Sequence, residues 1–205
     1  MVDLFNYTRR ASSVAHIGAL DLGGDNPIRI QSMTTTNTND TEACVRQAEE
    51  IIKAGGELVR FTTQGSREAE NMKNINAGIR ADGYQTPLVA DVHFNPNVAD
   101  VAALYCEKVR VNPGNYVDPA RKFIKQEYTD EEYAHELQKI EDRFVPFLNI
   151  CKENHTAIRI GVNHGSLSDR IRNRYGDTPE GIVESCLEFL RICKKENFHD
   201  VVISI

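Results

Sequence analysis

The chain has 205 residues, 40% of them hydrophobic and 26% charged, which is enough for one sizeable α/β core. Its formal net charge of −6 argues against a general nucleic-acid-binding surface. The first residues lack the apolar run of a signal peptide and no stretch approaches the roughly 18 apolar residues of a membrane span, so we expect a cytoplasmic protein that binds neither nucleic acid nor a membrane.

Short apolar runs alternate with stretches of helical periodicity along the chain. Residues 13–27 predict a short N-terminal hairpin with a Gly-Gly turn, which we expect to cover one end of a sheet. Six strands are predicted at 27–33, 57–62, 87–92, 107–112, 156–162 and 200–205. Helices are predicted at 40–54, 67–82, 96–106, 130–151 and 178–193, with Pro146 expected to kink or interrupt the fourth. This alternation implies a parallel sheet of right-handed βαβ units.

Four of the predicted strands place an arginine between apolar neighbours. These arginines are Arg29, Arg60, Arg110 and Arg159. Because residues i and i+2 of a strand face the same side, each arginine shares its side with another polar or small residue near the end of its strand. The opposite sides are apolar, and we expect residues such as Ile28 and Ile30 to face helices.

Two architectures fit this order of elements, an open doubly wound sheet and a (β/α)8 barrel. Helices cover both faces of a doubly wound sheet, so polar side chains in mid-strand would be hard to place there. In a barrel they face a central cavity, whose mouth lies at the C-terminal ends of the strands. We therefore predict an α/β fold of the TIM (β/α)8-barrel type, present only as about six strands.

The predicted barrel is incomplete, and its sixth strand has no helix after it. We expect residues 1–205 to be the N-terminal part of a barrel domain in a longer protein. Two open strand edges favour pairing with another chain, so we expect the chain by itself to associate or to be only marginally stable.

Inward arginines at a barrel mouth would form a site for a polyanion, because the guanidinium group binds phosphate oxygens bidentately. For Arg60, Arg110 and Arg159 we favour ligand binding over the alternative of salt bridges inside the barrel, for example to Asp91. For Arg29, which is nearest the closed end, we favour the salt bridge.

Polar residues at other strand ends extend this predicted site. Asp91 and His93 share a face in VADVHFNP, and hydrogen bonding to the ligand is favoured over a metal half-site or an acid–base pair. Asn112, in NPGN, lies on the side of the preceding arginine. The segment GVNHGSLSDR is similar to a phosphate-cradling loop in which Gly165 and Ser166 present backbone N–H groups before a helix.

Five cysteines are present, widely spaced and without a C-x-x-C pair. They are Cys44, Cys106, Cys151, Cys186 and Cys193. An odd number of cysteines without a secretory signal predicts reduced thiols, and we interpret them as core residues rather than metal ligands.

Five blocks of the sequence resemble the 4-hydroxy-3-methylbut-2-enyl diphosphate synthase family. The blocks are IRIQSMTTTNTNDT, VADVHFNP, VRVNPGNY, IRIGVNHGSLSDRIRNRYGDTPEGIVES and FHDVVISI. They cover nearly the whole chain in order, and NHGSLSDR with the charged 128–145 helix is similar to the long form of the family, which has an extra domain after the barrel. This is an iron–sulfur oxidoreductase family of the non-mevalonate pathway of isoprenoid biosynthesis.

The resemblance implies a barrel that binds 2-C-methyl-D-erythritol 2,4-cyclodiphosphate, whose ring is opened reductively with two electrons from a [4Fe–4S] cluster. The substrate-binding residues that it implies are Arg60, Asp91, His93, Arg110, Asn112, Arg159 and Asn163. It implies neither a catalytic nor a metal-binding residue in this chain, because the cluster ligands of the family belong to a separate C-terminal domain. It further implies a homodimer, ferredoxin or flavodoxin as electron donor, and no activity for the chain alone.

Two other functions fit the residues. One is a pterin-binding-synthase-like barrel enzyme, which has a related mouth with Asp and Asn at strand ends. The other is a non-catalytic phosphate-binding module whose arginines sense a metabolite. Cluster-ligating cysteines after residue 205 would distinguish the synthase from both.

Overall fold

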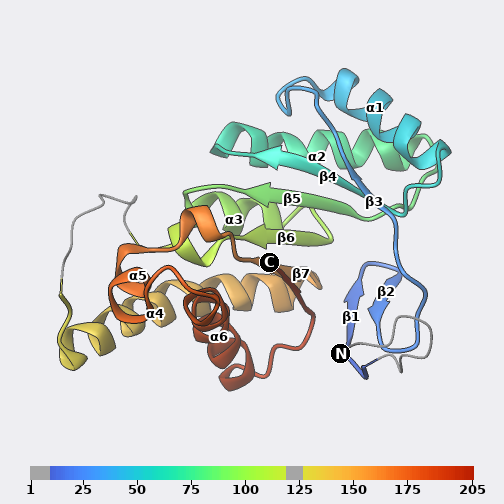
Figure 1. Ribbon diagram of the computed structural model, residues 1–205. Coiled ribbons are helices and arrows are strands. Elements are labelled where there is room, and N and C mark those ends of the chain that lie inside the picture. The colour runs from blue at the N-terminus through green and yellow to red at the C-terminus, as the bar shows by residue number, and fades with distance from the viewer. Residues whose placement is uncertain (1–9, 119–126) are drawn as a thin grey trace.

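The computed structural model describes residues 10–118 and 127–205. In these ranges β1 (Val14–Ile17) and β2 (Leu20–Gly23) form an antiparallel hairpin, and a parallel sheet has the order β3-β4-β5-β6-β7-β8. The strands of the sheet are β3 (Gln31–Met33), β4 (Leu58–Thr63), β5 (Leu88–Val92), β6 (Lys108–Val111), β7 (Ala157–Gly161) and β8 (Val201–Ser204). The spatial order equals the chain order and the sheet curls into half a barrel, so the predicted fold class is confirmed (Figure 1).

Helices connect the strands and pack on the outer face of the sheet (Figure 1). They are α1 (Thr41–Lys53), α2 (Ser66–Ala81), α3 (Pro96–Ala103), α4 (Asp130–Asn154), α5 (Asp169–Tyr175) and α6 (Pro179–Lys195). Single 3₁₀ turns, η1 (Pro113–Asn115) and η2 (His164–Ser166), follow β6 and β7. None of the described helices is both long and apolar enough to cross a membrane.

The helix ends follow the capping residues of the sequence. Asp40, Asn95 and Thr178 each accept a hydrogen bond from a backbone N–H of the first turn, in α1, α3 and α6. The five helices predicted from periodicity all exist, and α5 is the helix expected after Gly165 and Ser166, whereas the two 3₁₀ turns are too short to show a periodicity.

Helix α4 continues through Pro146, so the predicted interruption does not occur. Its buried residues lie on both sides of the proline, with Phe144 before it and Phe147, Leu148 and Cys151 after it. This continuous apolar face packs into the main core and compensates for the hydrogen bond that proline cannot donate.

A small second core closes the N-terminal end of the half-barrel. Ile17 of the hairpin packs there against the inward side chains Leu58, Val89 and Ala157. The His16 N–H also donates to Asp200 just before β8, over 2.8 Å. The hairpin therefore covers one end of the sheet, as predicted, but its turn is at Gly18-Ala19, and the predicted Gly-Gly turn is wrong because Gly23 and Gly24 lie at the end of β2.

The first strand of the sheet differs from the prediction. It begins at Gln31 rather than at 27, and Ile28 and Ile30 are 87% and 60% exposed, so the prediction that they face helices is wrong. The reason is that β3 is an edge strand, with a neighbour only on the β4 side among the described residues. Arg29 pairs with Glu57 over 2.9 Å and donates to the Asp21 carbonyl, which confirms the salt bridge favoured for it.

Candidate functional site

Strand register arranges the inward side chains of the half-barrel in layers. The lower layer, next to the closed end, contains Arg60, Val89, Lys108 and Ala157. The layer above it, toward the C-terminal ends of the strands, contains Thr62, Asp91, Arg110 and Arg159. We call these two layers the cation site, because they bring four cationic side chains and one carboxylate onto the inner face of the sheet.

Asp91 is the acidic centre of the cation site and is 2% exposed. Arg60 forms an ion pair with its Oδ2, His93 Nε2 lies 3.1 Å from the same oxygen, and Arg110 Nη1 lies 3.3 Å from Oδ1. Burial raises the pKa of Asp91, but the hydrogen bond with His93 and the charges of Arg60 and Arg110 outweigh burial and hold that pKa below its usual range. The ionised carboxylate therefore orients all three side chains, and the salt bridge to Asp91, which was the less favoured alternative for these arginines, exists for Arg60 and Arg110.

One carboxylate does not neutralise the arginines around it. Arg110 Nη2 donates to the Gly161 carbonyl and Arg159 Nε donates to the Ser204 hydroxyl, each over 2.9 Å, so both also use neutral acceptors. Burial lowers the pKa of Arg110 and of Arg159, and neighbouring arginine charges lower both further. Three arginines against Asp91 leave two positive charges without an acidic partner.

Two details of packing indicate that this arrangement is specific. The Nε of Arg60 is buried and has no hydrogen-bond partner among the described residues, which is also true of Arg170 Nε and the Tyr116 hydroxyl. At Gly161 a Cβ atom would lie 2.4 Å from Arg110 Nε, so only glycine leaves room for this guanidinium. An inner face of the sheet on which cationic side chains outnumber the one carboxylate is suited to an anion.

Asn112 and Asn163 begin the 3₁₀ turns η1 and η2. These turns form the rim of the half-barrel, so the two asparagines do not lie inside the cation site. Asn112 Oδ1 accepts from the Gly114 N–H over 3.1 Å, and its Nδ2 donates to the Ser166 hydroxyl over 2.8 Å. Asn163 is exposed, and its Oδ1 accepts from the Gly165 N–H over 3.0 Å. Both side chains thus stabilise the 3₁₀ turns that follow β6 and β7.

The predicted phosphate-cradling loop is not formed in the structure. The N–H groups of Gly165 and Ser166 both donate to Asn163, the first to its side chain and the second to its carbonyl. The prediction that they face an anion is therefore wrong, because the 3₁₀ turn uses these donors internally. The turn instead approaches η1 so closely that a Cβ atom at Gly114 would lie 1.7 Å from the Ser166 carbonyl.

A buried ion cluster behind the rim was not predicted. Arg170 of α5, 2% exposed, donates to both carboxylate oxygens of Glu188 on α6, over 2.6 and 2.8 Å. It also donates to Asp118 over 3.2 Å, and Tyr133 of α4 donates to Glu188 over 2.6 Å. This cluster fixes the segments that carry η1 and η2. No sequence signal connects Arg170 with Glu188 and Asp118, because their contact depends on how the helices pack.

Lys108 was also missed, although the sequence contained a signal for it. It precedes Arg110 by two residues and therefore faces the same side of β6. It is 2% exposed, and its Nζ donates to Gln31 Oε1 over 3.1 Å. Lys108 thus adds a buried cation to the lower layer.

The cysteines of this chain do not fit an iron–sulfur cluster. All five are free and buried, distributed over α1, α4, α6 and the segment before β6, which confirms that they are core residues. Burial raises the pKa of each thiol, whereas a cluster needs several thiolates together. Among residues 10–118 and 127–205, no three His, Cys, Asp or Glu side chains are arranged to hold a metal ion.

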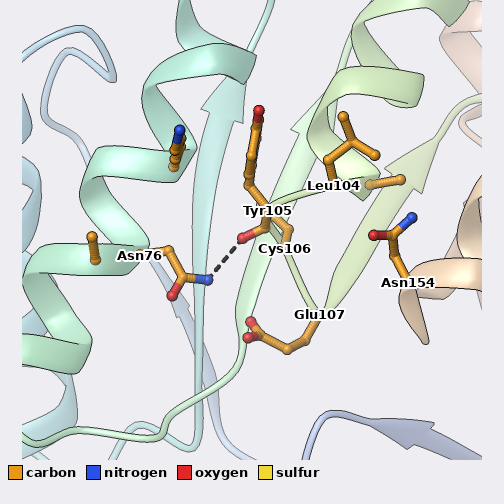
Figure 2. Close-up of a pocket in the computed structure, with 9 residues that line it drawn as sticks. Asn76, Leu104, Tyr105, Cys106, Glu107 and Asn154 are labelled. Atoms are coloured by element: carbon orange, nitrogen blue, oxygen red, sulfur yellow. Dashed lines mark hydrogen bonds between the residues drawn. The ribbon is translucent and has the colours of Figure 1, made fainter.

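A hollow of about 360 Å³ lies outside the half-barrel, against α2, the end of α3 and the segment before β6 (Figure 2). Asn76 donates to the Tyr105 carbonyl across it over 2.8 Å, and Glu107 is paired with Arg80 over the same distance. Because these polar groups already have partners and the hollow contains none of the residues of the cation site, we assign no function to it.

Comparison with known proteins gives a consistent match. Residues 12–205 match the family described as GcpE TIM-barrel domain. This chain is 76% identical over 204 residues to two enzymes named 4-hydroxy-3-methylbut-2-en-1-yl diphosphate synthase (flavodoxin), one from Phocaeicola vulgatus and one from Bacteroides thetaiotaomicron. The matched region is 100% of this chain and 33% of each relative. The enzyme of the same name from Akkermansia muciniphila is 50% identical over 98% of this chain and 34% of its own length. The chain thus spans about a third of the length of these curated relatives.

A solved structure supports the fold. The crystal structure of 7,8-dihydropteroate synthase from Vibrio fischeri matches with a TM-score of 0.58, over 94% of this chain and 66% of that chain. At 12% identity this likeness shows a common fold and carries no function, so it does not favour the pterin-binding alternative. From the match over 12–205 and the 76% identity of its relatives, the chain belongs to the GcpE TIM-barrel domain family of 4-hydroxy-3-methylbut-2-en-1-yl diphosphate synthases.

Proposed function

We propose that residues 1–205 form the N-terminal part of the substrate-binding barrel of a 4-hydroxy-3-methylbut-2-enyl diphosphate synthase, and that the cation site binds 2-C-methyl-D-erythritol 2,4-cyclodiphosphate. The observation that carries this proposal is the charge balance around Asp91, where three arginines leave two positive charges without an acidic partner. The two phosphates of the cyclic diphosphate carry one negative charge each, so the ligand complements the site. The names of the relatives support the same enzyme.

In this proposal the arginines hold the diphosphate and Asp91 holds the arginines. Arg110 and Arg159 are neighbours in register on β6 and β7, so their side chains start from adjacent positions on the inner face of the sheet. Arg60 adds its unused Nε donor from β4. Because these side chains are fixed before the ligand arrives, little reorganisation opposes binding.

His93, Asn112 and Asn163 complete the proposed substrate contacts from the rim. His93 is held by Asp91, at the end of β5. The two asparagines lie at the starts of η1 and η2, where small movements of these turns would direct their amides toward the ligand. The part of this chain in the reaction is therefore positioning and electrostatic stabilisation rather than electron transfer.

The redox group belongs to another part of the protein in this proposal. A [4Fe–4S] cluster, when bound, supplies the two electrons for ring opening, and the full-length protein is an iron–sulfur oxidoreductase of isoprenoid biosynthesis. The cysteines described above do not fit a cluster, so we place its ligands in the two thirds of the relatives' length that this chain does not span. We further propose a cytoplasmic homodimer that receives electrons from flavodoxin, which the relatives' names include, or from ferredoxin.

Calorimetric titration of the cyclic diphosphate into the full-length protein tests the site. We expect Arg110→Met to weaken binding by about 10- to 150-fold, because a charge-assisted hydrogen bond contributes about 1.5–3 kcal/mol. Arg191→Met, which removes an exposed arginine paired with Glu184 on α6, is the matched control and should bind as the wild type does. Equal affinity of Arg110→Met and wild type would refute the assignment.

A second measurement tests the division of labour. The 205-residue chain by itself, supplied with a strong reductant and the cyclic diphosphate, should show no turnover. Product formation by this chain alone would contradict the proposal that the redox group lies elsewhere.

A further inference from the structure

Lys108 lies on the floor of the cation site, one layer below Arg110 and Arg159. Its side chain starts on β6 and reaches β3, where Nζ donates to Gln31 Oε1 over 3.1 Å. Beneath it is the apolar plug in which Ile17 packs against Leu58. The ammonium group is therefore enclosed between apolar side chains on one side and cationic side chains on the other.

The charge of Lys108 has no acidic partner in the part of the chain that the structure describes. Its hydrogen-bond partner there is a neutral amide. The charged groups that act on it are Arg60 of β4 and Arg159 of β7, which are positive, while Asp91 of β5 is occupied by Arg60, Arg110 and His93. A buried ammonium without a counter-charge is costly, so the site is incomplete without an anion.

We propose that Lys108 is a fourth cation of the anion site, and that binding of the anion is coupled to the uptake of one proton from solvent at Lys108 Nζ. The inference rests on the proposed function, because the anion is taken to be the cyclic diphosphate. No bond of the ligand forms or breaks in this step; the proton adds to the free amine, and the ligand stabilises the ammonium.

The direction of the coupling follows from the environment of Lys108. Burial, followed by the charges of Arg159 and Arg60, lowers the pKa of Lys108 to about 8. An anion above it favours the ammonium and raises that pKa in the complex. The affinity for the anion is therefore full below about pH 8 and falls by up to tenfold for each pH unit above it, until the pKa of the complex is reached.

The cyclic diphosphate suits the measurement because both of its phosphates are esterified and strongly acidic, so no group of the ligand titrates near pH 8. His93 is the other titratable side chain close to Asp91.

The test is calorimetric titration of the full-length protein with the cyclic diphosphate in buffers of different ionisation enthalpy. We expect the wild type to take up about 0.9 proton at about pH 9, one unit above the pKa of the free site, and almost none from Lys108 at about pH 6.5. Lys108→Met should lose this uptake and bind about 10- to 100-fold more weakly at about pH 7. Lys108→Arg has a permanent charge, so it should bind the cyclic diphosphate at about pH 9 without taking up a proton.

Lys195→Met is the matched control, because Lys195 is an exposed lysine on α6 that pairs with Glu141. It should keep both the affinity and the proton uptake. A wild type that binds the ligand with unchanged affinity from about pH 7 to 10 and takes up no proton would overturn the inference, whether or not the variants fold. Uptake that persists in Lys108→Met would also overturn it.

Failure of the proposed function would be distinguishable from failure of this inference. A wild type that does not bind the cyclic diphosphate would refute the proposed function. Sulfate, a dianion that does not titrate in this range, then serves as the second probe. Proton uptake with sulfate that depends on Lys108 would still support the inference, and its absence would refute it.

Discussion

Two regions of the molecule bury arginines but balance their charges differently: the cation site of the half-barrel, and the ion cluster behind the rim, which we call the rim cluster. In the rim cluster, Arg170 is matched by Glu188 and Asp118. Burial lowers the pKa of Arg170, yet the hydrogen bonds to Glu188 and the two carboxylate charges outweigh burial and raise it. In the cation site Arg60 and Arg110 share one carboxylate, and Arg159 donates to a hydroxyl.

This difference separates a structural cluster from the proposed binding site. Arg170 connects α4, α5 and α6 with the segment after β6, and its charge is satisfied without a ligand. The arginines of the cation site are held in place by Asp91 but not neutralised, so their remaining charge is available to an anion. A buried arginine is thus informative about function only once its partners have been counted.

Breaking the rim cluster should have the largest effect on stability. Arg170→Met leaves Glu188 buried without its cation, and we expect the free energy of unfolding to fall by about 3–5 kcal/mol, measured by urea denaturation. The matched control is Arg172→Met on the same helix, which removes a more exposed pair with Asp177 and should cost about 0–1 kcal/mol. Equal losses in the two variants would show that the rim cluster is not distinctive.

Removing the carboxylate of the cation site should have an intermediate effect that depends on pH. Asp91→Asn leaves Arg60 and Arg110 without their acidic partner, and we expect a loss of about 1–3 kcal/mol near pH 7. The pKa of Asp91 is lowered in the fold, so its contribution is present above the unfolded value of about 3.9 and is lost as the pH falls through the folded value.

Urea denaturation of wild type and Asp91→Asn from about pH 7 down to about pH 3 checks this sign. The difference between the two proteins should be full above about pH 5 and should shrink below about pH 4. A difference that grows as the pH falls would mean that the carboxylate is destabilising in the fold.

The smallest effect is expected where a cation has no acidic partner. Arg159→Met removes a charge that is next to Arg60 and Arg110 and loses one hydrogen bond, to Ser204. We expect the unfolding free energy without ligand to stay within about 1 kcal/mol of wild type or to rise, as measured by urea denaturation. A loss as large as that of Arg170→Met would remove the distinction between the two regions.

Much of the fold could be predicted because local signals repeat along the chain. Capping residues such as Asp40 and Thr178 mark helix starts, and period-two alternation placed Arg60, Arg110 and Arg159 on one side of their strands. The same alternation also places Lys108 on the side of Arg110, although Lys108 was not predicted as a site residue. The edge strand could not be predicted in detail, because the exposure of Ile28 depends on which strands lie beside it rather than on its own sequence.

The sequence by itself determined the order of strands and helices, the inward arginines and, through five blocks of resemblance, the family. Only the tertiary structure decided how the charges are paired: Asp91 with two arginines, Arg170 with Glu188, and Lys108 with a neutral amide 77 residues away in sequence. The physical reason is that strand and helix periodicities are local and leave their mark in neighbouring residues. The partner of a buried charge is set by the register of strands and the packing of helices, which bring distant residues together.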